Sequence, residues 1–249
     1  RNPPANVHKW RAAGLDRLVR TLLGFHVRQM VPQLVEVQVE ARLSAADAPA
    51  GIDSRLVYRV YGSGEIVLEN QVSIEAQMPF VPRVGLELIL SPGLENLAWY
   101  GRGPHENYLD RRKGAAVGRY RSTVTEQFTP YVYPTESGGK EDVRWLALTD
   151  ERGAGLLVAG LKPLHFDALH YTIQDLEAAG HPYELTLLEE TVLHLDGWHM
   201  GVGGDDGWWS SVHEEFLILP GTYRYGMWLR ALPPGEDPAI LARMPLPVG

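Results

Sequence analysis

Hydrophobic and polar residues alternate along most of the chain, which is the pattern of β-strands with one face toward water. The clearest case is residues 35–43, where valine, alanine and leucine alternate with glutamate, glutamine and arginine. Turns that contain glycine, at residues 62–64 (GSG) and 151–154 (ERGA), lie between such runs and predict two hairpins. The strands predicted in this way cover residues 35–43, 54–61, 65–76, 83–90, 145–150, 155–160, 183–195, 214–219 and 223–231.

Only the first 25 residues follow a helical spacing. Apolar residues from Trp10 to Leu22 recur at intervals close to a helical turn, with arginines between them, and predict a short helix. The proline-rich segment 232–249 is expected to be loosely attached. Many short strands with almost no helix predict an all-β antiparallel sandwich or barrel. No composition shift marks a linker, so a single domain over residues 1–249 is expected.

Composition narrows the range of partners. The chain has 249 residues, 45% of them hydrophobic, which is enough to bury a sizeable core. A net charge of −8 argues against nucleic acid or an anionic membrane as partner. There is no apolar run long enough to cross a membrane and no signal-peptide pattern, so a cytoplasmic protein is expected. The absence of cysteine excludes disulfides. The first residue is Arg1 rather than Met, which suggests a fragment of a longer chain.

The most unusual stretch is residues 196–209, DGWHMGVGGDDGWW. Five glycines predict a backbone bent into conformations that other residues resist. Three tryptophans must be buried or must face a ligand. Flat rings beside carboxylates are typical of a sugar site, in which the ring stacks on the apolar face of the sugar. The structural alternative is a loop whose tryptophans close the end of a β-sandwich, and composition alone favours that alternative slightly.

A second group of polar and aromatic residues lies at 99–111 (WYGRGPHENYLDR) and 129–138 (TPYVYPTESG). Neither segment has strand periodicity, so long ordered loops at one edge of the sheet are expected. Such loops on a rigid scaffold often carry binding function. Charge-assisted hydrogen bonds that pin the loops are the alternative, and the residues around Glu106 favour it. The charged residues concerned are Arg102, Glu106, Asp110 and Arg111.

Motifs for specific chemistry are weak. No histidine pair has the spacing of a helical zinc site, and His165 and His170 near Asp167 give only a faint signal, so no metal is expected on this chain. There is no nucleophile elbow or phosphate-binding loop. A glycosidase needs two carboxylates. The sequence offers Asp196, Asp205, Asp206, Glu106 and Glu136, but their spacing does not show that any two meet.

Residues 99–111, 129–138 and 196–206, taken in this order, closely resemble the C-terminal domain of glycoside hydrolase family 2 β-galactosidases. Residues 10–14 (WRAAG) are also similar to that family. The resemblance extends from about residue 4 to residue 231. It implies a large antiparallel two-sheet supersandwich similar to the galactose mutarotase fold, which agrees with the alternating pattern.

The resemblance also implies a division of labour. In such enzymes the catalytic glutamates, and the magnesium and sodium ligands, lie mainly on a preceding TIM barrel, which is absent here. This chain would therefore carry no catalytic residue and no cofactor, and would be inactive alone. Its partners would be the remainder of the same β-galactosidase chain and a β-galactoside substrate, lactose being only the family's default. The full-length enzyme would be a homo-oligomer.

One residue of this domain reaches the active site in the family, and the matching position here is Trp208. The resemblance implies that its ring is a platform for the sugar in the aglycone subsite. Four neighbours, Trp198, His199, Asp205 and Asp206, would shape the loop. The family commonly has serine at Gly207 and a small residue at Trp209, so either Trp208 or Trp209 could face the sugar. Leu109 and His105 also depart from the family, which often has proline and glutamine there.

Two other functions stay open at this stage. A free-standing carbohydrate-binding subunit is one, because some members of the family are split into two chains. A sugar epimerase is the other, with His199 and Asp205 or Glu136 as its acid and base, although no motif supports it.

Overall fold

The structure is a computed structural model that describes residues 5–48, 50–205 and 212–246. The chain divides into two compact units. Unit 1 comprises Arg1–Val84, Trp198–Trp228 and Leu246–Gly249. Unit 2 comprises Gly85–Gly197 and Leu229–Pro245. The single domain expected from the sequence stays a prediction.

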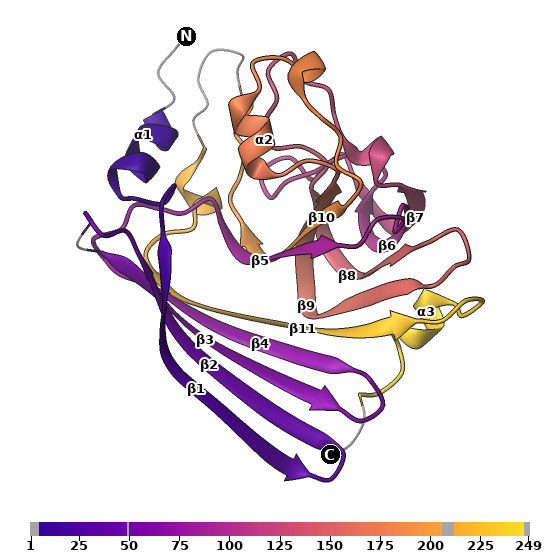
Figure 1. Ribbon diagram of the computed structural model, residues 1–249. Coiled ribbons are helices and arrows are strands. Elements are labelled where there is room, and N and C mark those ends of the chain that lie inside the picture. The colour runs from indigo at the N-terminus through magenta and orange to yellow at the C-terminus, as the bar shows by residue number, and fades with distance from the viewer. Residues whose placement is uncertain (1–4, 49, 206–211, 247–249) are drawn as a thin grey trace. The chain divides into compact units, whose positions relative to one another are not determined.

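Unit 1 is built on long antiparallel strands. Four strands lie side by side in the order β1-β2-β3-β4, followed by β11 (Figure 1). Helix α1 precedes the strands, and Trp10 on it donates a hydrogen bond from Nε1 to the carbonyl of Phe80 at 2.8 Å. The elements are α1 (Ala5–Ala12), β1 (Val19–Val31), β2 (Leu34–Ser44), β3 (Gly51–Tyr61), β4 (Ile66–Ile74), η3 (Glu214–Phe216) and β11 (Gly221–Leu232).

Unit 2 contains the other strands, in the order β7-β6-β8-β9, with β10 pairing both β9 and β5. Every register recorded for these strands is antiparallel. Strands β5 and β10 each have an end in unit 1. The elements are β5 (Arg83–Leu90), β6 (Asn96–Gly103), β7 (Ala116–Thr123), η1 (Thr125–Gln127), β8 (Lys140–Thr149), β9 (Gly155–Leu169), α2 (Ile173–Ala178), η2 (Pro182–Glu184), β10 (Thr191–His199) and α3 (Pro238–Leu241).

The all-β antiparallel class predicted from the alternating pattern is confirmed. The two predicted hairpins exist as β3–β4 and β8–β9, with paired registers on both sides of each turn. Strands β2, β5 and β11 also match predicted runs. Among the described residues, no helix combines the length and apolar character that a membrane span requires.

The helix predicted within the first 25 residues is wrong beyond Ala12. Residues Val19–Val31 form strand β1, which pairs along its length with β2, from Val19 opposite Ser44 to Val31 opposite Leu34. Pairing with β2, interrupted by register shifts after Leu22 and Gln29, outweighs the weak helical spacing, because most helical stability in proteins comes from tertiary packing. The β1 side chains are largely exposed, as expected for the last strand in the order.

Three further predictions need correction. Residues 99–103, read as loop, belong to β6. Close packing explains the missing periodicity, since a Cβ on Gly101 would lie 2.6 Å from Val143 Cγ2. The predicted strand 214–219 is a 3₁₀ turn, η3, followed by a bridge from Ile218 to Val81. The predicted strand 183–195 becomes regular only at Thr191, because η2 precedes it.

Short helices close the connections of unit 2. Helix α2 begins with a capping box, in which the Thr172 hydroxyl accepts from the Asp175 amide and Asp175 accepts from the Thr172 amide. In the proline-rich tail, Asp237 caps α3 by accepting from the Ala239 amide at 2.8 Å. Ala239 and Leu241 are buried, so this part of the tail is packed rather than loose.

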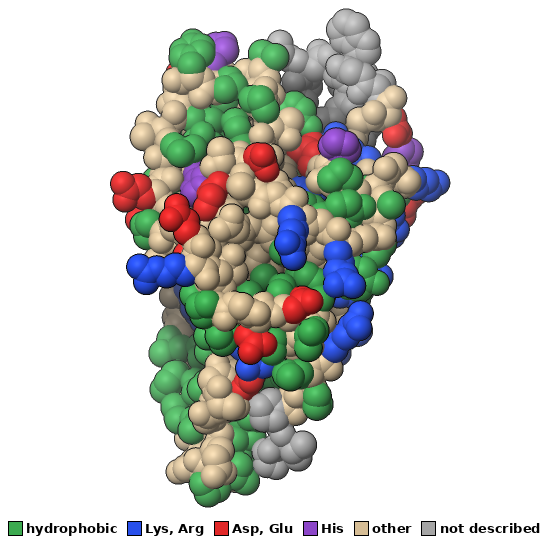
Figure 2. Space-filling model, turned by 90° about the vertical axis from the view of Figure 1, so that its right-hand side faces the viewer, with side chains coloured by type: hydrophobic (Ala, Val, Ile, Leu, Met, Phe, Trp, Pro, Cys, Tyr) green, Lys and Arg blue, Asp and Glu red, His purple; other side chains and the backbone are tan. Residues whose placement is uncertain are grey.

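The face in Figure 2 mixes basic and acidic side chains with hydrophobic ones.

Gly155 at the start of β9 provides a direct test of the β8–β9 hairpin. A Cβ there would lie 1.9 Å from the carbonyl oxygen of Leu148, a backbone atom that cannot move aside cheaply. We expect Gly155→Ala to lower the free energy of unfolding by about 3 kcal/mol, measured by urea denaturation. Gly114→Ala is the matched control, because nothing lies within 4 Å of its Cβ position. Equal effects of the two substitutions would contradict this packing.

Candidate functional site

The glycine-rich loop after β10 is anchored to the rest of unit 1 by its backbone. The amide of Met200 donates to the carbonyl of Pro82, and that of Gly201 donates to Phe216, each at 2.9 Å. His199 is buried, and its Nδ1 lies 2.7 Å from the carbonyl oxygen of Met200, so this nitrogen carries a proton. These contacts fix where the loop leaves the strand.

The glycines of this loop take the conformations that their density predicts. Gly203 and Gly204 have φ of 78° and 116°, values that side chains rarely adopt. Asp205 and His213 contact each other through Oδ2 and Nε2, so this pair joins the chain on the two sides of residues 206–211. In the epimerase alternative Asp205 would serve His199, whereas here it contacts His213.

The predicted sugar platform lies outside the described residues. Trp208, Trp209 and Asp206 all fall within 206–211, so the choice between the two rings stays a prediction. Trp198 is described, and its ring packs edge-on against Tyr223, with ring centroids 5.1 Å apart. The role of Trp198 as a support for the loop stays a prediction.

Glu106 joins the two polar loops of unit 2. Its carboxylate accepts from the Thr129 hydroxyl at 3.2 Å and from the Gly138 amide at 2.9 Å. Arg111 donates to it from Nη2 at 2.8 Å, and the hydroxyl of Tyr131 also contacts it. One carboxylate therefore pins residues 99–111 to residues 129–138, which is the structural alternative favoured from the sequence.

Asn107 and Tyr108 complete this junction as buried residues. The side-chain oxygen of Asn107 accepts from the backbone amide of Glu141 at 2.9 Å. The backbone amide of Asn107 donates to the carbonyl of Gly139 at 2.8 Å. The Tyr108 hydroxyl lies 3.5 Å from Glu136 Oε1 and accepts from the Gly139 amide. Burial, together with the carboxylates of Glu136 and Glu106, raises the pKa of Tyr108 far above its usual range, so the hydroxyl stays protonated.

Arg102, near the end of β6, connects Asp142 of β8 to the loop that follows β6. Its Nε lies 2.5 Å from Asp142 Oδ2, and its Nη1 donates to the carbonyls of Arg112 and Ala115. Asp142 has a φ of 54°, the only positive value among the described non-glycine residues. It sits where the β8–β9 register shifts between Lys140 and Val143. This β-bulge changes the direction of successive side chains of β8, so that they contact different partners.

A set of charged side chains is buried between β9 and β10. The register places Asp196 opposite His165 and His194 opposite Asp167, all on one face of the pair. His194 Nδ1 lies 2.8 Å from Asp167, and His165 Nδ1 lies 2.9 Å from Glu141. Donor atoms of His165, Asp167 and Asp196 all lie within 4.8 Å of one another. Sequence spacing did not reveal this group, because the two strands that carry it are far apart in the chain.

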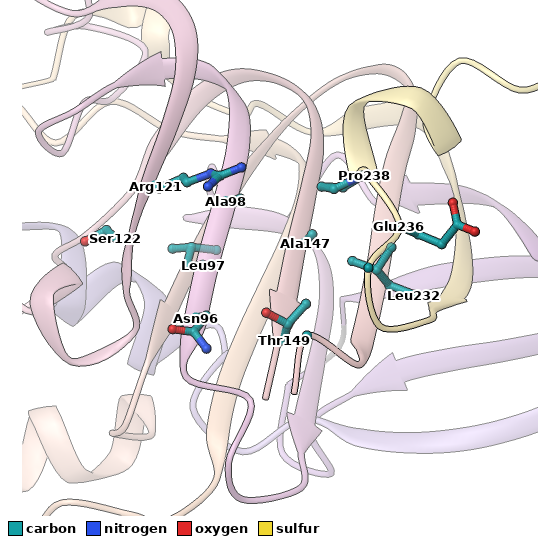
Figure 3. Close-up of a pocket in the computed structure, with 12 residues that line it drawn as sticks. Asn96, Leu97, Ala98, Arg121, Ser122, Ala147, Thr149, Leu232, Glu236 and Pro238 are labelled. Carbon is teal, nitrogen blue, oxygen red and sulfur yellow. The ribbon is translucent and has the colours of Figure 1, made fainter. Parts of the chain in front are cut away.

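A separate cavity of about 330 Å³ lies elsewhere in unit 2 (Figure 3). Residues of β6, β7, β8 and the β8–β9 turn line it, together with the end of β11 and the segment that follows. Arg121 and Glu236 are its charged members, and Leu97 and Leu232 contribute apolar surface. None of the residues predicted to form a site lines this cavity, so we assign it no role.

The described geometry is that of an all-β scaffold with ordered polar loops, and comparison with known proteins places it in a family. Residues 1–229 match the family described as beta galactosidase small chain, and this chain belongs to that family. It is 38% identical to a beta-galactosidase of Vibrio cholerae, over 92% of this chain and 22% of that protein. It is 35% identical to one of Priestia megaterium, over 84% of this chain and 19% of that protein. The chain thus spans about a fifth of these relatives.

Solved structures give more distant similarities. A putative aldose 1-epimerase from Escherichia coli K12 is 11% identical, with a TM-score of 0.37 over 84% of this chain and 69% of that one. A galactose mutarotase related enzyme from Lactobacillus acidophilus is 8% identical, with a TM-score of 0.38 over 86% and 72% of the two chains.

Replacement of Glu106 tests the junction between the two loops. Glu106→Gln puts an amide group where four donors converge, so we expect the free energy of unfolding to fall by about 2 kcal/mol. Urea denaturation at neutral pH measures the change. Glu151→Gln, at an exposed position in the β8–β9 turn, is the matched control. An unchanged midpoint for Glu106→Gln would show that the carboxylate does not hold the loops together.

Proposed function

We propose that this chain is a non-catalytic part of a retaining β-galactosidase, an enzyme that hydrolyses terminal β-D-galactosides such as lactose. The observation that carries the proposal is the family match over residues 1–229 in a chain that spans about a fifth of its relatives. The remaining length of such relatives is ample for a separate catalytic region. In our proposal that region is a TIM barrel with the catalytic glutamates and the magnesium and sodium ions.

The environments of Asp167, Asp196 and Glu106 support this division. A retaining glycosidase needs two carboxyl groups that reach the substrate, about 5–5.5 Å apart. Asp196 and Asp167 do lie close together, but their exposed fractions are only 1% and 2%, so substrate has no access to them. Glu106 is occupied by hydrogen bonds that hold the two loops. These groups serve structure rather than bond cleavage.

We further propose that Trp208 is the part of this chain that contacts substrate, as a platform in the aglycone subsite. The described neighbours support a presenting role for the loop. Met200 and Gly201 anchor its first half, and the contact between Asp205 and His213 joins the chain before and after residues 206–211. Flanking residues that are held on both sides suit a ring that must be positioned against a sugar, since positioning lowers the entropy lost on binding.

Substitution of each tryptophan in turn shows whether Trp208 or Trp209 is the platform for the sugar. In the full-length enzyme, Trp208→Ala should weaken binding of the aglycone sugar and transglycosylation about tenfold, because an aromatic contact contributes about 1.5 kcal/mol. Galactose binding should change less. Inhibition constants for glucose and galactose, with product ratios from lactose, measure the effect. Trp209→Ala is the control, and the same phenotype from Trp209→Ala alone would move the platform to that residue.

Activity of the chain by itself tests the division of labour. We expect no hydrolysis of a chromogenic β-galactoside by the 249-residue chain, and turnover once the missing portion of the enzyme is added. Hydrolysis by the chain alone would refute the non-catalytic role. The same samples test the two alternative functions. Direct binding of galactosides by the chain alone would support a carbohydrate-binding subunit. Faster interconversion of galactose anomers would support an epimerase.

A further inference from the structure

The first three strands of unit 1 share an apolar face. Residues directly opposite each other in paired strands point to the same side of the sheet, so the registers of β1, β2 and β3 show which side chains lie together. Two apolar rows cross the three strands in this way, and they are Phe25–Val39–Leu56 and Val27–Val37–Tyr58. These rows define the β1–β3 apolar face.

The opposite side of the same strands is charged, and its charges are paired within the sheet. Glu36 of β2 and Glu69 of β4 both contact Arg59 of β3, the first through Oε2 and Nε at 3.1 Å. Arg55 Nε lies 3.5 Å from Glu40 Oε1. This side of the sheet therefore suits contact with water, and the β1–β3 apolar face is the side that needs a cover.

The cover on the apolar face decreases toward β1. Leu56 of β3 is 4% exposed and Val39 of β2 is half-buried, whereas Phe25 and Val27 of β1 are each 58% exposed. Leu22, opposite Ala41, continues the exposed part of the face. Burial of apolar side chains is favourable, and monomeric soluble proteins rarely expose apolar patches of more than a few hundred Å². The face is therefore wider than the cover that the described residues give it.

The outer edge of β1 is poorly suited to the addition of another strand. β1 is the last strand in the order (Figure 1). Its register with β2 shifts between Leu22 and Gly24 and again between Gln29 and Val31. Irregularities of this kind twist an edge strand away from a straight partner and protect it from pairing. A partner would therefore contact the apolar side chains rather than extend the hydrogen-bonded ladder.

We propose that the β1–β3 apolar face docks against the region of a β-galactosidase polypeptide that lies outside this chain. The inference rests on the proposed function, because it takes the chain to be part of a longer enzyme. The length of the relatives decides between the possible occupants. The chain covers 19% of one relative and 22% of another, so about four-fifths of each lies outside the matched part.

The composition of the face agrees with a partner that never leaves. No residue of the two apolar rows is charged. Charged residues are depleted at the centre of interfaces, and permanent interfaces are more hydrophobic than those of partners that exchange. A neighbouring region of the same enzyme is a permanent partner of this kind.

Radical footprinting of the full-length enzyme tests the cover without reference to catalysis. Hydroxyl radicals oxidise exposed aromatic side chains, and mass spectrometry locates the products. Relative to the urea-unfolded enzyme, we expect oxidation of Phe25 to slow about tenfold, as for buried Phe166, which is 0% exposed. Tyr183, which is 81% exposed in this chain, is the exposed reference. A Phe25 rate as little slowed as that of Tyr183 would overturn the inference.

A pair of lysine substitutions in the full-length enzyme gives the second readout. Val27→Lys places a charge on the apolar face, so we expect the melting temperature to fall by about 5 °C. His26→Lys is the matched control, because His26 is the preceding residue of β1 and lies opposite Gln38 on the charged side. Equal melting temperatures for the two variants would show that Val27 faces water. The footprint of the wild-type enzyme still decides the question if Val27→Lys does not fold.

Dilution separates the proposed occupant from a second copy of the enzyme. Cover by the same polypeptide does not depend on protein concentration, so protection of Phe25 should persist when light scattering shows single chains. Protection that disappears on dissociation would overturn the inference in favour of a second copy. Hydrolysis of a β-galactoside by the 249-residue chain alone would refute the proposed function at any Phe25 rate. An exposed Phe25 in an enzyme that needs both parts would refute this inference alone.

Discussion

The pairing of β9 with β10 is the interaction on which unit 2 depends. β9 lies between β8 and β10, so it carries registers on both sides. Its pairing with β10 buries charged residues as well as apolar ones, with His194 against Asp167 as the closest contact. Removal of one partner from such a buried hydrogen-bonded pair leaves the other partner unsatisfied, which costs about 1–3 kcal/mol. The pairing thereby penalises alternative registers more than an apolar ladder would.

Strand β8, the other partner of β9, positions the two polar loops. The amide of Glu141 on β8 donates to Asn107, and Asp142 holds Arg102 from the next position. The first polar loop is thus attached at two successive residues of one strand. Glu106 in turn attaches the second loop to the first, by accepting from Thr129 and Gly138. Local order in these loops follows from a few charge-assisted hydrogen bonds rather than from an apolar core of their own.

Alternation of polar and apolar residues was sufficient to predict the all-β class and both confirmed hairpins. It failed for β1 because that strand has exposed apolar residues on both faces, so no period of two was visible. It failed for β6 because Gly101 replaces a side chain where the backbone of β8 approaches closely. In these cases tertiary contacts decide the structure, and a single sequence does not contain their geometry.

The candidate sites likewise differ in how far the sequence alone could predict them. The glycine-rich loop was recognisable from composition, whereas the buried group of His165, Asp167 and Asp196 was not. A local signal beyond the faint one from His165 and Asp167 is a repeated Leu-His-x-Asp, at residues 164–167 and 193–196, in two strands that each place histidine and aspartate on one face. The meaning of that repeat depends on the antiparallel register, which sets histidine opposite aspartate. Only the folded chain reveals the register.

The bulge at Lys140–Val143 has a consequence for how this protein tolerates change over evolution. Three steps along β8 there correspond to two along β9, from Lys140 opposite Phe166 to Val143 opposite Leu164. Deletion of a single residue at 141 or 142 would restore a regular ladder and reverse the side chains on one side of the bulge. Point substitutions at these positions would alter one contact each. Insertions and deletions would instead exchange whole sets of partners, so the length of this segment should be held more strictly than its composition.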